Sequence, residues 1–141
     1  MQAIAPATLD GLSKLAEIDV DTIQKYEDLG LLPQPRLRSG RRTSAPYHQE
    51  HLDRLHFIKR CTDLGFSLDA IADLLAVNGG MRTCGDIYVI AARQLEDVRT
   101  RIARLKRIED ELAPIVESCP RSGEVRACPI WQALRSQPAP R

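Results

Sequence analysis

The longest regular pattern in this 141-residue chain lies between positions 86 and 116, where apolar residues recur every three or four positions. This spacing puts apolar side chains on one stripe of an α-helix. The stripe consists of Leu95, Val98, Ile102, Leu105, Ile108, Leu112 and Ile115. About 30 residues make a helix of roughly 45 Å, and no other segment is long enough to cover it. We therefore expect a two-stranded coiled coil between two copies of the chain rather than packing within one copy.

Three cysteines lie around this helix. Cys84 precedes it, and Cys119 and Cys128 follow it on either side of the loop 120–127. If two helices pair antiparallel, Cys84 of one chain meets the loop of the other, and three thiolates form a site across the interface. Three sulfur ligands without a carboxylate favour a soft metal ion. The alternatives are a zinc clip that only holds the dimer, and a disulfide between the loop cysteines.

The composition narrows the class of protein further. Only 4% of the residues are aromatic, which is typical of a helical protein rather than a β-sandwich. No apolar run approaches the roughly 18 residues that cross a bilayer, and the N-terminus does not resemble a signal peptide. We expect a cytoplasmic protein without membrane contact, in which clustered cysteines indicate metal or redox chemistry. The sequence shows no nucleophile–base pair and no phosphate-binding loop. We therefore do not expect an enzyme or an organic cofactor.

The N-terminal half predicts several shorter helices joined by turns. They are expected at 9–16, 22–29, 49–64 and 68–75, with a further short helix at 129–134. Asp21 is the expected N-cap of the second helix, and Gly30 its stop. Two short helices with a tight turn are a helix-turn-helix candidate, and residues 33–47 indicate a loop or small wing. Cys61 is expected in the core, and the three histidines as packing or solvated residues.

A basic cluster accompanies the helix-turn-helix candidate. Residues 36–60 hold seven basic and two acidic side chains, although the net charge of the whole chain is only +1. Such a cluster beside a helical module favours contact with phosphates.

Three segments carry a resemblance to a known family. Residues 22–33 are similar to the recognition-helix segment of the MerR family of transcription regulators, and 47–55 to its wing-to-helix segment. Residues 55–71 resemble its second helical pair. The resemblance implies a mainly α protein that begins with a winged helix-turn-helix DNA-binding domain at 1–77. A hinge at 78–85 and a long antiparallel coiled-coil dimerisation helix at 86–117 are expected to follow. The chain is then expected to form a metal-binding loop and short helix at 118–134 and a disordered tail at 135–141.

The same resemblance implies a DNA-binding surface. Its predicted residues are Thr22, Gln24, Lys25, Tyr26, Arg41, Arg42 and Tyr47. The family usually has Arg at the position of Gln24 and an aromatic residue at Lys25, and it usually has an Arg shortly before Tyr47. Arg41 and Arg42 are expected to supply phosphate contacts from earlier in the wing.

Within this family, one Cys before the dimer helix and two after it resemble the mercury-responsive members. Cys84, Cys119 and Cys128 match that arrangement. The resemblance implies Hg(II) as effector, with Pb(II), Cd(II) or Zn(II) as alternatives. It also implies a homodimer on double-stranded promoter DNA, acting on RNA polymerase through metal-induced distortion of the DNA.

Overall fold

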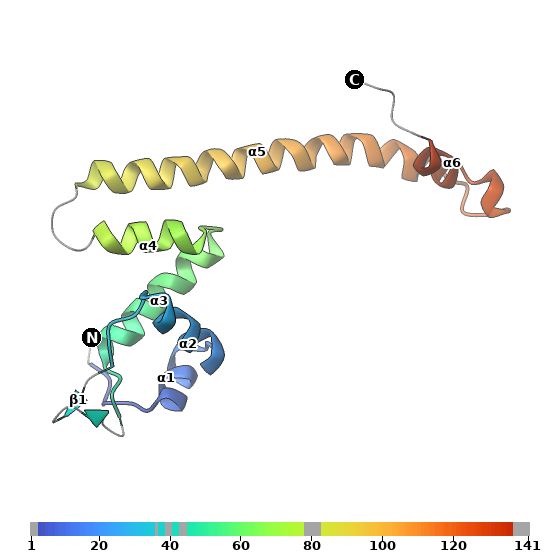
Figure 1. Cartoon of the computed structure of the whole chain (residues 1–141). Helices are drawn as coiled ribbons and strands as arrows, with labels where there is room; N and C mark the ends of the chain where they lie inside the picture. The colour runs from blue at the N-terminus through green and yellow to red at the C-terminus, as the bar shows by residue number, and fades with distance from the viewer. Residues whose placement is uncertain (1–2, 36, 39–40, 43–44, 78–82, 137–141) are drawn as a thin grey trace. The chain divides into compact units, whose positions relative to one another are not determined.

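The computed structural model describes residues 3–35, 37–38, 41–42, 45–77 and 83–136. Its elements are α1 (Leu9–Ala16), α2 (Val20–Asp28), β1 (Leu37–Arg38), β2 (Arg41–Arg42), α3 (Gln49–Asp63), α4 (Leu68–Val77), α5 (Cys84–Glu117), the 3-10 turn η1 (Val125–Ala127) and α6 (Pro129–Arg135) (Figure 1). The prediction of a mainly α fold is confirmed. The chain forms two compact units, Met1–Gln94 and Leu95–Arg141. None of the described helices combines the length and apolar character needed to span a bilayer.

The start of α2 differs from the sequence prediction. Asp19, and not Asp21, is the N-cap, because its carboxylate accepts a hydrogen bond from the Thr22 backbone N–H at 3.0 Å. The Thr22 hydroxyl also donates to this carboxylate, at 2.8 Å. These side-chain and backbone hydrogen bonds hold the pKa of Asp19 below its ordinary value. The helix therefore begins two residues earlier than predicted.

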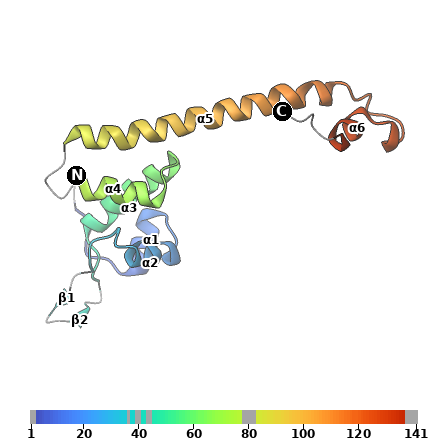
Figure 2. The ribbon, with the colours of Figure 1, turned by 45° about the horizontal axis from the view of Figure 1, so that its top comes forward.

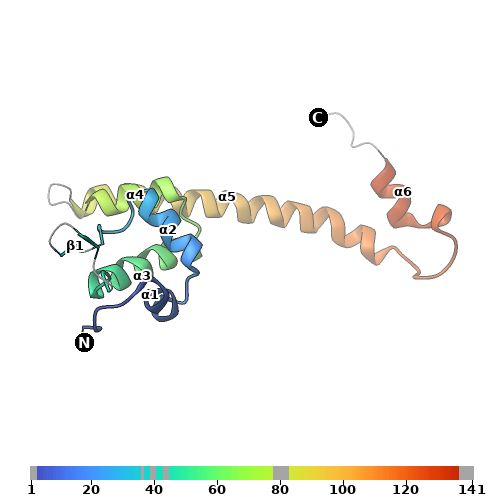
Figure 3. The same ribbon diagram turned by 60° about the horizontal axis from the view of Figure 1, so that its bottom comes forward.

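Helices α1 to α4 share one hydrophobic core. Helix α1 packs against α2 and α3, and α3 packs against α4 (Figure 3). Leu12, Ile23, Leu55, Ile58 and Ile71 are its fully buried aliphatic side chains. Cys61 is buried among them, as predicted, and burial raises the pKa of its thiol. This core fixes α2 on the framework of the other helices.

The segment between α2 and α3 carries a small wing. Strands β1 and β2 pair antiparallel, with Leu37 opposite Arg42 and Arg38 opposite Arg41. Figure 2 shows the two strands projecting from the helices of the first unit. At the base of the wing, Ala7 and Tyr47 form an isolated antiparallel bridge through two backbone hydrogen bonds. The predicted wing is therefore present.

Helix α5 is one continuous helix of 34 residues. It begins two residues before the predicted start because Asp86 accepts a hydrogen bond from the Thr83 backbone N–H at 2.7 Å, which caps the first turn. Pro114 lies inside the helix and does not end it. The predicted hinge at 78–85 falls largely on residues 78–82, outside the described residues, and the predicted tail likewise falls mostly on 137–141.

The apolar stripe of α5 is uncovered in the single chain. None of the residues of this helix is buried. The side chains of Leu95, Ile102, Leu105, Ile108 and Leu112 are 45 to 64% exposed. An apolar stripe of this length in contact with water is typical of a surface that another chain covers.

Candidate metal centre and nucleic-acid interface

The loop after α5 folds tightly around Cys119. The Cys119 backbone N–H donates to the Val116 carbonyl at 3.2 Å, and the Arg121 N–H points back to Cys119 Sγ at 3.4 Å. Arg121 and Gly123 both have positive φ, 62° and 103°, which reverses the chain direction. The loop therefore returns toward the end of α5 within a few residues.

Cys128 is held at the other side of the loop by η1 and α6. Its backbone N–H donates to the Val125 carbonyl at 3.0 Å, and its own carbonyl accepts from the Gln132 N–H. The Gln132 side chain donates to the Arg126 carbonyl at 3.1 Å, which ties α6 to η1. Cys128 is thus the N-cap residue of α6, followed by Pro129 at the first helical position.

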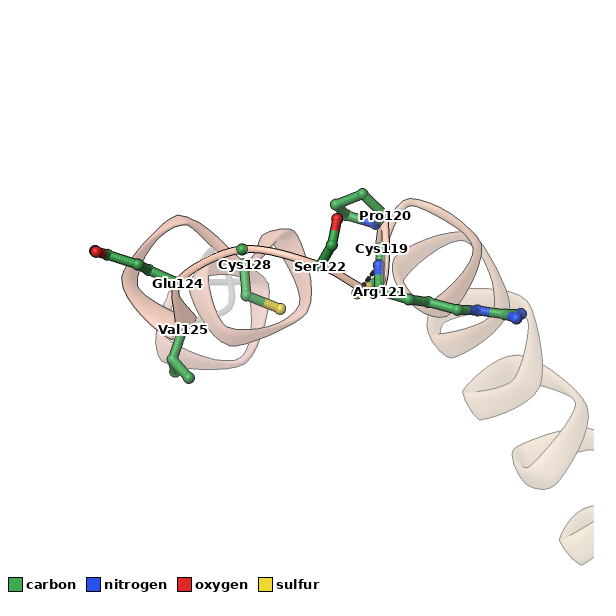
Figure 4. A pocket seen from close by; sticks show the side chains of 8 residues that line it. Cys119, Pro120, Arg121, Ser122, Glu124, Val125 and Cys128 are labelled. Atoms are coloured by element: carbon green, nitrogen blue, oxygen red, sulfur yellow. Dashed lines mark hydrogen bonds between the residues drawn. The ribbon is translucent and has the colours of Figure 1, made fainter.

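Cys119 and Cys128 line the same hollow of about 200 Å³, and both are half-buried. In Figure 4 the Cys128 sulfur points toward the segment that carries Cys119. The Glu124 carboxylate and the Arg121 guanidinium project away from the two cysteines. The described residues therefore offer sulfur at this hollow, without the carboxylate oxygens that hard cations prefer.

Hydrogen bonds around Cys128 make its thiol more acidic than an ordinary cysteine. Hydrogen bonding from the Trp131 backbone N–H lowers the pKa of Cys128, against an opposing effect of desolvation. The Ile130 N–H and the Cys119 side chain lower it further. Because a metal ion binds the thiolate and not the thiol, this lower pKa reduces the cost of deprotonating Cys128 for metal binding.

Cys84 stands apart from this pair in the fold. It is the exposed first residue of α5 and belongs to the unit Met1–Gln94. An α-helix of 34 residues is about 50 Å long, so its two ends cannot share a metal ion. Within one chain, the described residues contain no group of three His, Cys, Asp or Glu side chains that could hold a metal. A site that combined Cys84 with Cys119 and Cys128 would therefore need sulfur from two chains.

The predicted DNA-contact residues differ in exposure. Gln24 and Lys25 are exposed on α2, and Thr22 is half-buried at its first turn. Tyr26 and Tyr47 lie in the core with exposures of 9% and 2%. Both rings pack in the hydrophobic core. A contact between either tyrosine and DNA stays a prediction. Arg41 and Arg42 form strand β2 of the wing.

Three interactions near this surface had no clear sequence signal. The Tyr47 hydroxyl donates to the Glu27 carboxylate, which links the end of the wing to α2. His51 is fully buried, and its Nδ1 accepts from the His48 backbone N–H at 3.0 Å at the start of α3. His51 also stacks edge-on against Tyr47, with ring centroids 5.2 Å apart. His51 therefore packs in the core and His48 takes part in capping α3.

Two protein-family models match the sequence of these units. The model described as MerR HTH family regulatory protein matches residues 7–77, and the model described as MerR, DNA binding matches residues 52–115. The chain belongs to the MerR family of transcription regulators.

Relatives of this MerR-family chain include metal-resistance regulators. The mercuric resistance operon regulatory protein of Bacillus cereus is 41% identical, over 83% of this chain and 88% of that protein. The protein of the same description from Serratia marcescens is 36% identical, over 95% of this chain and 91% of its own length. Among solved structures, the lead(II) complex of the transcription regulator PbrR691 from Ralstonia metallidurans has a TM-score of 0.77 and 33% identity, covering 91% of this chain and 98% of that chain.

Proposed function

We propose that this protein is a Hg(II)-responsive transcription regulator that binds promoter DNA as a homodimer. The observation that carries the proposal is the placement of sulfur. Cys119 and Cys128 line one hollow. Cys84 begins the helix whose apolar stripe is exposed in the single chain. Antiparallel pairing of two α5 helices would bring Cys84 of one protomer to the hollow of its partner. The dimer would then hold two equivalent three-thiolate sites.

The choice of Hg(II) rests on ligand chemistry and on the relatives. A soft ion of low coordination number is satisfied by three sulfurs, whereas structural zinc takes four ligands. Glu124 lines the hollow, but its carboxylate points away from the two cysteines, so no carboxylate of the described residues is placed there to supply a fourth ligand. The two curated relatives described above are mercury regulators, which favours Hg(II) over the lead bound by PbrR691. Bound metal would supply the free energy that favours one arrangement of the dimer over another.

The DNA-binding units would act through α2 and the wing. A two-fold dimer presents two α2 helices to successive major grooves, where the exposed Gln24 and Lys25 would face base edges or phosphates. Arg41 and Arg42 of the wing would contact phosphates, which fix position rather than sequence. Closure of the metal site would change the angle between the two DNA-binding units of the dimer. This change would distort the promoter DNA on which RNA polymerase acts.

Metal titration of the reduced protein tests this proposal. Hg(II), Pb(II), Cd(II) and Zn(II) are added separately and in competition, and thiolate-to-metal charge-transfer absorbance is recorded. We expect one Hg(II) per three-thiolate site, bound in the presence of excess Zn(II), and loss of this site in Cys84→Ser, Cys119→Ser and Cys128→Ser. The matched control is Cys61→Ser, because Cys61 lies in the core of the other unit. Tighter binding of Pb(II) or Zn(II), or full binding by Cys84→Ser, would refute the mercury assignment.

A further inference from the structure

The first turns of α5 are packed against the DNA-binding helices. Ile90 lies against the core of the first unit. Ile87 and Ala91 line an apolar hollow of about 250 Å³ together with side chains of α3 and α4 and with Phe66 from the turn between these helices. Figures 1 and 2 both show this part of α5 beside α4. The segment that begins at Cys84 is therefore part of the DNA-binding unit.

One hydrogen bond fixes this packing in register. The Gln94 side chain donates from Nε2 to the Leu64 carbonyl at 3.0 Å. Leu64 is the C-cap of α3, where backbone carbonyls lack partners within their own helix. Gly65 leaves room for this contact, because a Cβ there would lie 2.9 Å from Gln94 Nε2. The positive φ of Gly65, 84°, also favours glycine.

We propose that Gln94 is a positioning residue that transmits closure of the metal site to the DNA-binding helices. The inference rests on the proposed function. Cys84 and Gln94 lie on the same helix, so a pull on the sulfur moves both together. Gln94 passes this movement to the end of α3 through Leu64. Helix α3 contacts α1, and α1 contacts α2, so the displacement reaches the recognition helix through packed elements.

This role predicts that loss of the Gln94 hydrogen bond changes the transcriptional response to Hg(II) without changing the affinity for Hg(II) or for the operator. Gln94→Met keeps the length of the side chain and removes the donor. Metal affinity depends on the cysteines and operator affinity on α2 and the wing, so both should stay near wild type. The transmitted signal should weaken: the ratio of transcription with Hg(II) to transcription without it should fall roughly fivefold, the size expected for one neutral hydrogen bond. Gln94→Lys retains a donor and should restore most of the ratio.

The experiment uses the full-length protein with a promoter that carries its operator. Transcription in vitro is measured with and without Hg(II), beside operator affinity, Hg(II) stoichiometry and thermal unfolding for each variant. Arg93→Met, an exposed neighbour on α5, is the control for placing Met on this helix.

The outcomes are distinct. A lower ratio in Gln94→Met alone, with unchanged operator and Hg(II) binding, supports the inference. An unchanged ratio overturns it. An equal loss of operator affinity without metal also overturns it, because Gln94 would then only stabilise the fold. If the wild-type protein itself fails to bind Hg(II) or to respond to it, the proposed function fails first, and the inference falls with it.

Discussion

Mixing two defective variants should restore Hg(II) binding if the site combines cysteines from two chains. One variant is Cys84→Ser, and the other is the double variant Cys119→Ser/Cys128→Ser. Neither homodimer contains a complete three-thiolate site. A mixed dimer contains one, formed by Cys84 of the double variant and the loop cysteines of the single variant. This arrangement follows from the separation of the cysteines along the 34-residue helix α5.

The expected recovery follows from the symmetry of the dimer. Random pairing of equal amounts of the two variants makes about half of the dimers mixed, and each mixed dimer has one intact site of two. Recovery should therefore reach roughly one quarter of the wild-type Hg(II) capacity. A site built within one chain would recover nothing, because every chain in the mixture lacks at least one ligand.

The assay unfolds the two variants together under reducing conditions, refolds them and titrates Hg(II) against excess Zn(II). The three-sulfur charge-transfer absorbance is compared with that of each variant refolded alone. Wild type refolded with Cys61→Ser is the control and should keep full capacity, since Cys61 is a core residue of the first unit. Absence of recovery in a mixture that demonstrably contains mixed dimers would refute a site shared between chains.

Three further predictions concern the fold that carries the site. Leu55→Ala, at a fully buried position, should lower the free energy of unfolding by about 2–5 kcal/mol in urea titrations, whereas Leu15→Ala, at a half-exposed position, should change it far less. Asp19→Ala should destabilise the protein at neutral pH through loss of the α2 cap. Because the folded pKa of Asp19 is depressed, its contribution to the free energy of unfolding is complete above the ordinary pKa of 3.8 and is lost as pH falls through the folded pKa. In acid unfolding, the stability difference between Asp19→Ala and wild type should therefore disappear in that pH range. A stability difference independent of pH would contradict this origin. Cys61 should react with iodoacetamide more slowly than the exposed Cys84 in the native protein, because burial raises its pKa and blocks access, and mass spectrometry should show this difference vanish in urea.

Local pattern was enough to predict most helices of this chain. Apolar periodicity predicted α1 and α3 to within a residue or two, and also the long helix α5. It also predicted that no other segment of the chain would bury the apolar stripe of α5. This prediction depends only on the length of the helix and on the spacing of its apolar residues. The order of the three cysteines around that helix is likewise a property of the sequence, and it predicted the soft-metal chemistry before any contact was known.

The tertiary structure decided what depends on residues distant in sequence or on backbone geometry. The sequence pattern predicted Asp21 as the N-cap of α2, whereas the turn geometry at Thr22 selects Asp19. Tyr26 and Tyr47 resemble DNA-contact residues by motif, yet both lie in the core.

The contact between Gln94 and Leu64 spans thirty positions, and no periodicity relates them. The sequence by itself thus determined most helices and their order, because helix periodicity is a local property, and the ligand types in it predict the chemistry of the metal site. Only the tertiary structure decided which residues of different elements meet, including the side chains that join the long helix to the DNA-binding unit, because those contacts arise when separate elements pack together.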